Sequence, residues 1–483
     1  MEKEFALTQK LLTLLDSEYR WFTLAEIEEQ LSVSDKTIRK IIDETQQELP
    51  PSITIEISRG KGVILHYAKR NVAFGEVISS MYRQRTFYQL LDLLFLEGGR
   101  YGLEELADKL YMSSSSLKKL IIRLNSHELK QYHLRITYSM PEVKGNEINI
   151  RYFYWKLYYD AYEFSGWPFP GMDQAQMLEY ITTIESENDI VYFLNAKRSL
   201  SFLAAIMMTR VLQGKYADIP RGQYHWESSM LHSSITAWVR ALEHRYSIHL
   251  PLDETRFLQA MLSLGQYNYY DEAKISTMIA MKKARLMQIQ EEEDQIVNHF
   301  LMLALATFPA IDMNDRFIWE IGEFFEKLRL ENSLPDMISI STSSLTEYVL
   351  RECRPMYQNV MNCMQEWGNR YPGILYNDYH LTKLTLLIVS SLRYNSKKAF
   401  LLIGGEFSIR HYVAKLIKNE IGDELIINTS IMEGLTDEII QKHNIDFVIS
   451  TFPVELNTVP VVIISTIPTK RDLENIRKEL MQP

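Results

Sequence analysis

Two segments near the start of the chain, residues 23–42 and 102–121, share one pattern of hydrophobic and polar positions at a constant offset of 79. In each, hydrophobic residues recur every three or four positions, stop at a short turn, and resume with the same spacing. That spacing predicts two short amphipathic helices joined by a tight turn. Ser34 follows the first turn and is the expected N-cap of the second helix, with a hydroxyl that accepts from free backbone N–H groups. The pattern is typical of a helix-turn-helix.

A candidate β-hairpin follows the first helix pair. Residues 53–57 alternate hydrophobic and polar side chains as a half-buried strand does, and residues 63–65 return after a glycine-containing turn. Arg59 and Lys61 lie at the expected tip of this turn. The segment therefore predicts a wing with two basic residues that can contact phosphates beside the groove.

The second helix pair also precedes a candidate hairpin. Its expected strands are Leu134–Tyr138 and Glu147–Arg151, and its expected turn contains Lys144, Gly145 and Asn146. Between the two helix pairs, residues 71–85 are expected to form a helical connector. The chain thus predicts two successive winged helix-turn-helix units.

The second helix of each pair begins with short polar side chains and continues with Lys and Arg. Short side chains approach base edges, while Lys and Arg reach phosphates or guanine edges. A solvated helix face has a similar composition, but two copies at one spacing favour DNA contact. The expected DNA-contacting residues are Ser34, Lys36, Thr37, Arg39, Lys40, Arg59, Lys61, Ser114, Ser115, Ser116, Lys118, Lys119 and Arg123.

The charge distribution is compatible with a nucleic-acid partner for the N-terminal part. The 483 residues carry a net charge of −10, yet the first 150 hold 20 Lys and Arg against 21 Asp and Glu. What matters for DNA is whether those bases gather on one face. We divide this part into a first winged unit, residues 1–68, and a connector with the second winged unit, residues 69–160.

The middle of the chain is expected to be all-helical. Residues 152–395 contain few glycines and repeat hydrophobic residues at three-four spacing. The hydrophobic positions of residues 200–211 recur in residues 381–392, at an offset of 181. This repeat indicates two related helical bundles, which we place at residues 161–285 and 286–396.

Residues 397–483 alternate short hydrophobic segments with amphipathic ones, which predicts a small parallel α/β domain. The expected strands are residues 398–403, 424–428, 445–450 and 459–464. The glycine pair Gly404-Gly405 follows the first strand, and we interpret it as a structural turn rather than a phosphate cradle.

Several classes of function receive no support from the sequence. The two cysteines, Cys353 and Cys363, have no partners at metal-ligand spacing and are expected to be buried free thiols in a reducing cytoplasm. We find no secretory signal, no hydrophobic run of the roughly 18 residues that a membrane span needs, and no nucleophile or acid–base motif. The prediction is a cytoplasmic protein without cofactor, metal, membrane association or enzymatic activity.

The order of these parts resembles the Mga/AtxA family of virulence regulators of Gram-positive bacteria, over essentially the whole chain. Members of that family have two N-terminal DNA-binding units and two helical phosphotransferase-system (PTS) regulation domains, called PRDs. Their C-terminal domain is similar to the enzyme IIB (EIIB) component of sugar transport systems. The resemblance implies a mainly α, multidomain fold with PRD-like bundles at residues 161–285 and 286–396 and an EIIB-like domain at residues 397–483.

The resemblance also implies a function. It suggests a DNA-binding global transcription regulator, expected to activate virulence and metabolic genes. Its implied partners are double-stranded DNA, a second copy of the chain, and a PTS phosphocarrier protein. Two alternatives stay open: a PTS-linked phosphotransfer protein, and an RNA-binding antiterminator, although the latter class begins with a β-rich RNA-binding domain.

In this family a histidine of each PRD can be phosphorylated, and His380 is the candidate in the second bundle. The offset of 181 places Ser199 at the matching position of the first bundle. His380 can also be interpreted as a helix-end histidine without a regulatory role. EIIB proteins carry a phosphorylated Cys just after the first strand, where this chain has Gly404. The resemblance therefore implies that the C-terminal domain serves dimerisation or sensing.

Overall fold

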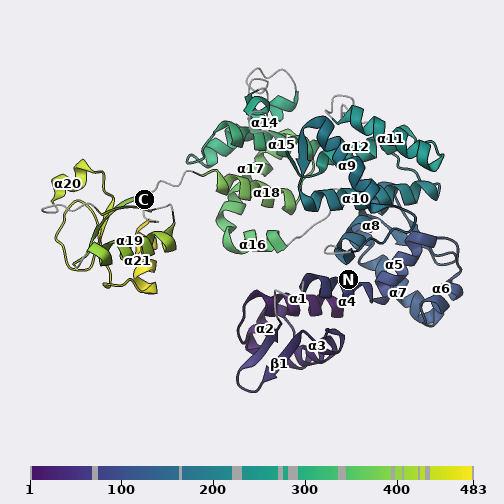
Figure 1. Ribbon diagram of the computed structural model, residues 1–483, viewed down its shortest axis with the longest axis horizontal. Helices are drawn as coiled ribbons and strands as arrows, with labels where there is room; N and C mark the ends of the chain where they lie inside the picture. The colour runs from purple at the N-terminus through teal and green to yellow at the C-terminus, as the bar shows by residue number, and fades with distance from the viewer. Residues whose placement is uncertain are drawn as a thin grey trace. The chain divides into compact units, whose positions relative to one another are not determined.

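The computed structural model is mostly helical and divides into two compact units (Figure 1). The larger unit comprises residues 1–304 and 314–387, and the smaller comprises residues 305–313 and 388–483. The structure describes residues 3–67, 74–162, 166–219, 231–269, 276–280, 292–334, 344–392, 397–404, 407–422, 425–429 and 436–480.

The first winged unit has the predicted helix pair and hairpin, preceded by a helix, α1 (Lys3–Ser17), that was not predicted. Helices α1, α2 (Leu24–Leu31) and α3 (Asp35–Glu48) precede an antiparallel hairpin of β1 (Thr54–Ser58) and β2 (Gly62–His66). Phe22 forms an isolated antiparallel β-bridge with Val63 of β2, in which its N–H and C=O groups each bond Val63 at 2.8 Å. A capping box at Thr23 begins α2, and the Thr23 N–H bonded to Glu26 lowers the pKa of that carboxyl.

The second winged unit repeats this arrangement at the predicted offset. Helices α4 (Phe74–Arg83) and α5 (Thr86–Glu97) precede the helix pair α6 (Leu103–Lys109) and α7 (Ser114–Ser126). Both helices of each pair begin 79 residues apart, as the sequence predicts. The short helix η1 (Lys130–Tyr132) then leads into a hairpin of β3 (Arg135–Ile136) and β4 (Val143–Lys144).

The prediction for the second hairpin was wrong in its return strand. Residues 147–151 form the start of helix α8 (Glu147–Tyr162) instead of a strand. The alternating pattern was misleading because Asn149 and Arg151, which alternation places on a solvated face, are buried together with their hydrophobic neighbours. The Asn146 side chain accepts the Ile148 N–H at 2.9 Å, which starts the helix.

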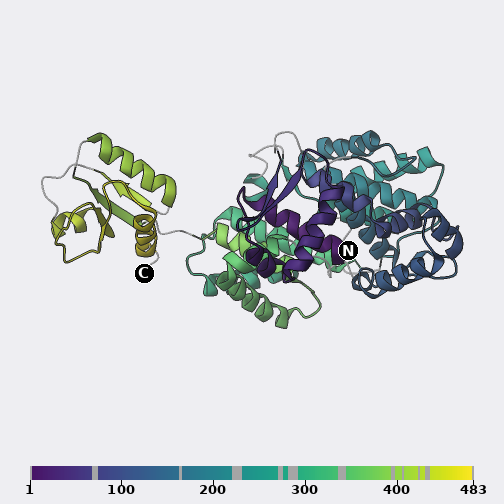
Figure 2. The same cartoon turned by 90° about the horizontal axis from the view of Figure 1, so that it is seen from below.

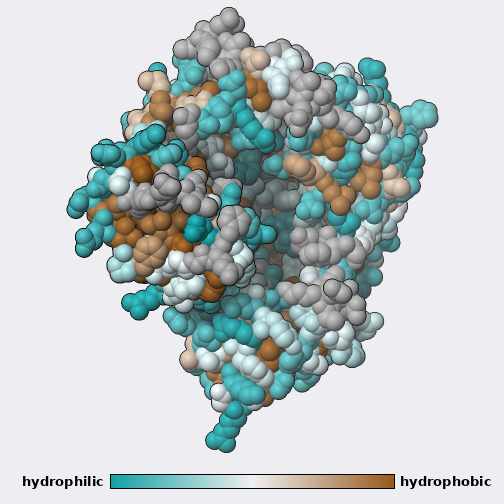
Figure 3. Space-filling model, turned by 60° about the vertical axis from the view of Figure 1, so that its left-hand side comes forward, coloured by the Kyte–Doolittle hydropathy of each residue, from teal (hydrophilic) through white to brown (hydrophobic). Residues whose placement is uncertain are grey.

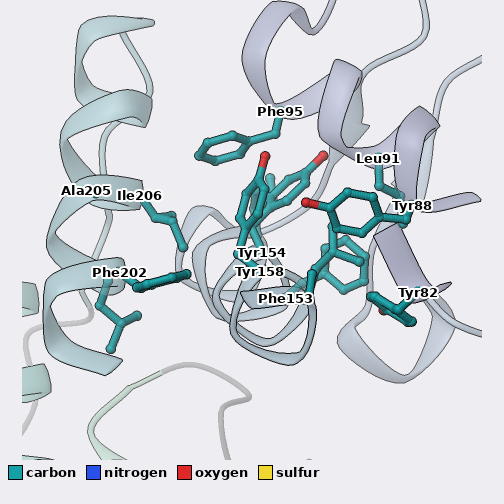
Figure 4. Packing of buried hydrophobic residues seen from close by; sticks show 14 of the residues in the cluster. Tyr82, Tyr88, Leu91, Phe95, Phe153, Tyr154, Tyr158, Phe202, Ala205 and Ile206 are labelled. Carbon is teal, nitrogen blue, oxygen red and sulfur yellow. The ribbon is translucent and has the colours of Figure 1, made fainter. Parts of the chain in front are cut away.

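An aromatic core joins the second winged unit to the helices that follow. Phe95 of α5 packs against Tyr154 and Tyr158 of α8, with ring centroids 4.6 and 5.2 Å apart (Figure 4). The Tyr158 hydroxyl donates to Asp92 at 2.7 Å, and burial raises the pKa of this carboxyl. The start of the helical region and the second winged unit therefore share one hydrophobic core.

A buried ionic cluster lies at the beginning of α8. The Arg151 guanidinium, which is 0% exposed, donates to both carboxylate oxygens of Glu254 at 2.6 and 2.8 Å. Arg151 also contacts Glu147, and Glu147 accepts two bonds from Arg210. Paired and hydrogen-bonded charges are tolerated in a core where a single one would be costly. The cluster connects α8 to α10 (Leu194–Leu212) and α12 (Leu252–Leu264).

The described residues between α8 and residue 397 form helices and one short strand pair, which the all-helical prediction did not include. Strands β5 (Ile190–Tyr192) and β6 (Tyr267–Tyr269) pair in antiparallel orientation. The helices are α9 (Gln174–Asn188), α10 (Leu194–Leu212), α11 (His232–Tyr246), α12 (Leu252–Leu264), α14 (Glu292–Thr307), α15 (Asp315–Asn332), α16 (Ser344–Glu352), α17 (Arg354–Arg370) and α18 (Asp378–Ser390).

The smaller unit contains the predicted parallel sheet, in the order β10-β9-β7-β8. Helices α19 and α21 pack on a core that includes Leu401 and Phe447, and α20 packs on Phe400 and Val448. Since successive side chains of a strand point to opposite faces, helices cover both faces of the sheet. Figure 2 shows helices packed around these strands. The elements are β7 (Lys397–Leu402), α19 (Phe407–Ile421), β8 (Leu425–Asn428), α20 (Asp437–Lys442), β9 (Phe447–Ser450), β10 (Val461–Ile463) and α21 (Lys470–Leu480).

The surface carries hydrophobic patches among hydrophilic side chains, as one face of the molecule shows in Figure 3. Among the described residues of the smaller unit, the large hydrophobic side chains that reach solvent are Leu305, Tyr412, Ile426, Phe452, Ile463 and Ile467. Among the described residues, no helix combines the length and the apolar character that a membrane crossing requires.

Candidate nucleic-acid interface

Helix α3 presents the predicted polar side chains of the first winged unit. Lys36, Arg39 and Lys40 are exposed and Thr37 is half-buried, whereas Ile38, Ile41 and Ile42 form the buried face. Ser34 is the N-cap, but its hydroxyl bonds the Thr37 hydroxyl at 3.0 Å and not a backbone N–H as predicted.

Two basic side chains of α3 are engaged with acidic neighbours on the same helix. Arg39 Nε lies 2.8 Å from Asp35 Oδ1, and Lys40 Nζ lies 3.5 Å from Glu44 Oε1. Both pairs are about half exposed, so they are weak and can exchange for phosphate contacts.

Helix α7 is the more basic recognition helix. Ser113 caps it by accepting the Ser116 N–H at 3.1 Å, and no acidic residue lies in its first turn. Ser115, Ser116, Lys118 and Lys119 are exposed; Ser114 is half-buried. Within the described part of the chain, Lys118 and Lys119 form no ion pair, so both ammonium groups are available to phosphates.

Arg123 lies further along α7, in its last turn, and is half-buried. The structure therefore brings the predicted side chains of α7 together along one helix, with the serines at its start and Arg123 at its far end.

The tip of the first wing carries its two predicted bases. Arg59 and Lys61 are exposed on either side of Gly60, in the three-residue loop between paired residues Ser58 and Gly62. The Lys61 ammonium lies 5.6 Å from the centre of the Trp21 ring, within cation–π range. The wing therefore presents two positive charges to solvent.

The second wing differs from the prediction. Lys144 belongs to strand β4, with its ammonium 2.5 Å from Glu142, and Gly145 and Asn146 follow the strand. The loop between the strands instead exposes Tyr138 and Met140. The second wing therefore offers an aromatic and a thioether side chain where a basic tip was expected.

Tyr111 is a candidate contact that the sequence reasoning missed. It is 98% exposed and occupies the turn between α6 and α7 in the left-handed conformation, at φ 53°. Ser32 holds the same conformation in the first turn, 79 residues earlier. The offset therefore contained the signal: a large ring stands where the first copy has a small polar residue.

His380 belongs to a separate site, at the start of α18. Its Nδ1 accepts the Asn377 N–H at 3.1 Å, and its Nε2 lies 2.7 Å from Glu331 Oε2. The Asn377 side chain in turn accepts the N–H groups of Tyr379 and His380, at 3.1 and 3.4 Å. This reciprocal pattern is that of a capping box in which a histidine takes the usual place of Glu or Gln. The ring is buried, with 3% of its surface exposed.

The remaining predicted features lie as follows. Cys363 is buried and Cys353 is half-buried, and both are free thiols, so the burial prediction is confirmed for one of them. Gly404 follows strand β7, and its N–H donates to Thr451 Oγ1 at 3.2 Å. Gly405 lies outside the described residues.

Comparison with known proteins supports this reading of the N-terminal part. Residues 2–61 match the M protein trans-acting positive regulator (MGA) HTH domain, and residues 70–158 match the Mga helix-turn-helix domain. A trans-acting regulator of Bacillus anthracis is 32% identical over 108 residues, which cover 22% of this chain and 71% of that protein. The chain belongs to the Mga/AtxA family.

Two longer members of the Mga/AtxA family match almost end to end. The capsule synthesis positive regulator AcpB of Bacillus anthracis is 26% identical over 99% of this chain and 98% of its own length. The anthrax toxin expression trans-acting positive regulator of the same organism is 25% identical over 99% and 98%. The similarity therefore extends through the helical region and the smaller unit.

Proposed function

We propose that this chain is a DNA-binding transcription activator. The observation that carries the proposal is the pair of helix-turn-helix units, each with a recognition helix that exposes short polar and basic side chains. Relatives across nearly the full length are named positive regulators, which favours an activator over a repressor and virulence genes as targets. A non-enzymatic role in the cytoplasm accords with this family.

The double substitution Lys118→Ala/Lys119→Ala tests the DNA contact. Each phosphate contact contributes about 0.9 to the slope of log affinity against log salt, so we expect the slope to fall by about 1.8 and binding to weaken. Fluorescence anisotropy with a labelled duplex, measured over a series of salt concentrations, gives both quantities.

Lys415→Ala/Lys418→Ala is the matched control, because it removes two exposed lysines from α19 of the smaller unit. If the α7 double variant keeps the salt slope of the parent while the control also does, α7 does not contact phosphates.

We propose further that His380 is the regulatory position, within PRD-like bundles at residues 161–285 and 286–396. The 181-residue repeat supports these bundles, and a PTS phosphocarrier protein would be the phosphoryl donor. In the conformation described, both ring nitrogens are engaged, and the Glu331 carboxylate would repel a phosphoryl group on Nε2. Phosphorylation would therefore have to break the Glu331 contact and the capping box, which would alter the packing of α18 on α15.

Replacement of His380 separates this regulatory role from a purely structural one. We expect His380→Asp, a partial charge mimic, to change transcriptional output from a target promoter. His380→Ala should report only the loss of the capping contacts, since it adds no charge. Equal output from both variants and the parent, with and without an active PTS, would leave this histidine a structural residue.

Dimerisation through the EIIB-like domain at residues 397–483 is the last part of the proposal. Among the described residues of this domain, five large hydrophobic side chains reach solvent, and two of them, Ile426 and Ile463, lie on the edge strands β8 and β10. An edge strand with hydrophobic side chains readily pairs with another chain.

A further inference from the structure

A cavity of about 560 Å³ lies among the helices of the larger unit. Its walls come from α8, α10, the end of α12, the end of α15 and the start of α18. Ser199 and His380, the two positions related by the offset of 181, both line it. Small-molecule sites in proteins typically enclose about 300–1,000 Å³, so this volume is sufficient for one.

One wall of the cavity is aromatic. Tyr152, Trp155 and Tyr159 follow one face of α8, with ring centroids 5.2 Å apart for the first pair and 5.7 Å for the second. The planes of Trp155 and Tyr159 differ by only 27°. A wall of nearly aligned rings can stack against a flat apolar face of a ligand.

The cavity lining also contains polar and charged side chains whose formal charges cancel. Glu331 and Lys383 line the cavity, one negative and one positive, together with the side-chain amides of Asn195, Gln266 and Asn377. A strongly charged ligand would therefore meet an equal number of like and opposite charges.

Three polar groups that line the cavity have no hydrogen-bond or ion-pair partner among the described residues. Within the described part of the chain, the Tyr152 hydroxyl, the Gln266 amide and the Lys383 ammonium form no hydrogen bond or ion pair, although Lys383 lies 4.2 Å from the Tyr379 ring centre. Burial raises the pKa of the Tyr152 hydroxyl, which keeps it a neutral donor. Gln266 is exposed, whereas Tyr152 and Lys383 are half-buried, and polar groups that are withdrawn from solvent are normally satisfied by ordered water or a ligand.

We infer that this cavity binds a small ring-shaped ligand that carries hydroxyl groups and no net charge, such as a free monosaccharide or a nucleoside. Its flat face stacks on the aromatic wall of α8, and its hydroxyl edge bonds Tyr152, Gln266 and the groups around His380. This site is independent of DNA contact, because none of its residues lies on a recognition helix or wing.

Titration of the full-length chain with glucose and with adenosine tests the inference and distinguishes the two sources. Glucose 6-phosphate and adenosine monophosphate add charge to the same rings. We expect one neutral compound to bind, by isothermal titration calorimetry, and to raise the unfolding temperature, because a ligand that binds only the folded state stabilises it. Its phosphorylated counterpart should bind about tenfold more weakly.

Two variants locate the binding at this cavity. Ala196→Trp fills the cavity from α10 and should abolish binding; Leu194→Trp, at an 81% exposed position of the same helix outside the lining, should bind like the parent. Tyr152→Phe keeps the ring and removes the free hydroxyl, so we expect affinity to fall about fivefold. The inference is wrong if neither neutral compound binds the parent, if Ala196→Trp or Tyr152→Phe binds as tightly as the parent, or if the phosphorylated compounds bind better.

Discussion

Asp35 sits at the start of the first recognition helix, where its carboxylate holds Arg39 at 2.8 Å. The counterpart of Asp35 in the second helix is Ser114, which carries no charge. An acidic side chain at this place repels phosphates and competes with them for the guanidinium. The first helix therefore has fewer available positive charges than the second.

Asp35→Asn is expected to tighten DNA binding and to steepen the salt slope by up to about 0.9, because Arg39 is released for one phosphate contact. Fluorescence anisotropy against salt concentration measures both effects. Asp43→Asn removes an equal charge from an exposed position two turns further along α3 and serves as the control. Should Asp35→Asn bind no better than Asp43→Asn, the start of α3 does not approach the phosphates.

Single residues were predicted well where local chemistry decides their place. The N-cap position of Ser34, the exposed bases of α3 and α7 and the tip of the first wing follow from spacing within one motif. The partners of Ser34 and His380 could not be predicted in the same way. The Ser34 hydroxyl bonds the Thr37 hydroxyl in place of a backbone N–H. His380 contacts Glu331, which lies 49 positions away in the sequence.

At the scale of elements, the first wing depends on one glycine. Gly62 begins β2 at φ +106°, and an added Cβ would lie 2.0 Å from the Phe22 carbonyl oxygen. That carbonyl accepts the Val63 N–H and so holds Phe22 in its β-bridge with β2. A side chain at residue 62 would therefore both strain the backbone and push Phe22 out of the sheet.

Gly62→Ala is expected to lower the free energy of unfolding by about 2–3 kcal/mol, since backbone strain of this kind alone costs about 1–3 kcal/mol. Chemical denaturation measures this loss. Gly60→Ala is the matched control: its φ is +85°, but an added Cβ meets nothing within 4 Å, so only about 1–2 kcal/mol should be lost. Equal losses in the two variants would contradict a role for the Phe22 contact.

Elements were predictable where the hydrophobic period was undisturbed, as in both helix pairs and the C-terminal sheet. The prediction failed at residues 147–151, because Arg151 and Asn149 are polar residues with buried partners. Arg151 meets Glu254, and Asn149 donates to the Tyr132 carbonyl at 3.1 Å. These partners are remote in sequence. The alternation of hydrophobic and polar residues alone therefore could not show whether the polar residues are solvated or buried.

At the scale of the whole molecule, assembly is expected to depend on the smaller unit. Ile463 is 53% exposed on the edge strand β10. Ile463→Lys places a charge on this edge, which opposes strand pairing between chains. We expect the parent to be a dimer and the variant to shift toward monomer in analytical ultracentrifugation.

Met302→Lys controls for the loss of a hydrophobic side chain elsewhere, because Met302 is 71% exposed in the larger unit. A dimer that persists unchanged in Ile463→Lys, and also in Ile426→Lys on the opposite edge strand β8, would assign the interface to the helical region.

The buried ion pairs at the start of α8 and the exposed lysines of α7 should respond differently to salt. If the exposed lysines of α7 contact DNA as proposed, counterions compete for them, but counterions do not reach Arg151 and Glu254, which are 0% exposed. Rising ionic strength should therefore weaken DNA binding, while the buried ion pairs continue to hold α8 against α10 and α12. A regulator built in this way can dissociate from a promoter while the packing of α8 against α10 and α12 is preserved for the next binding event.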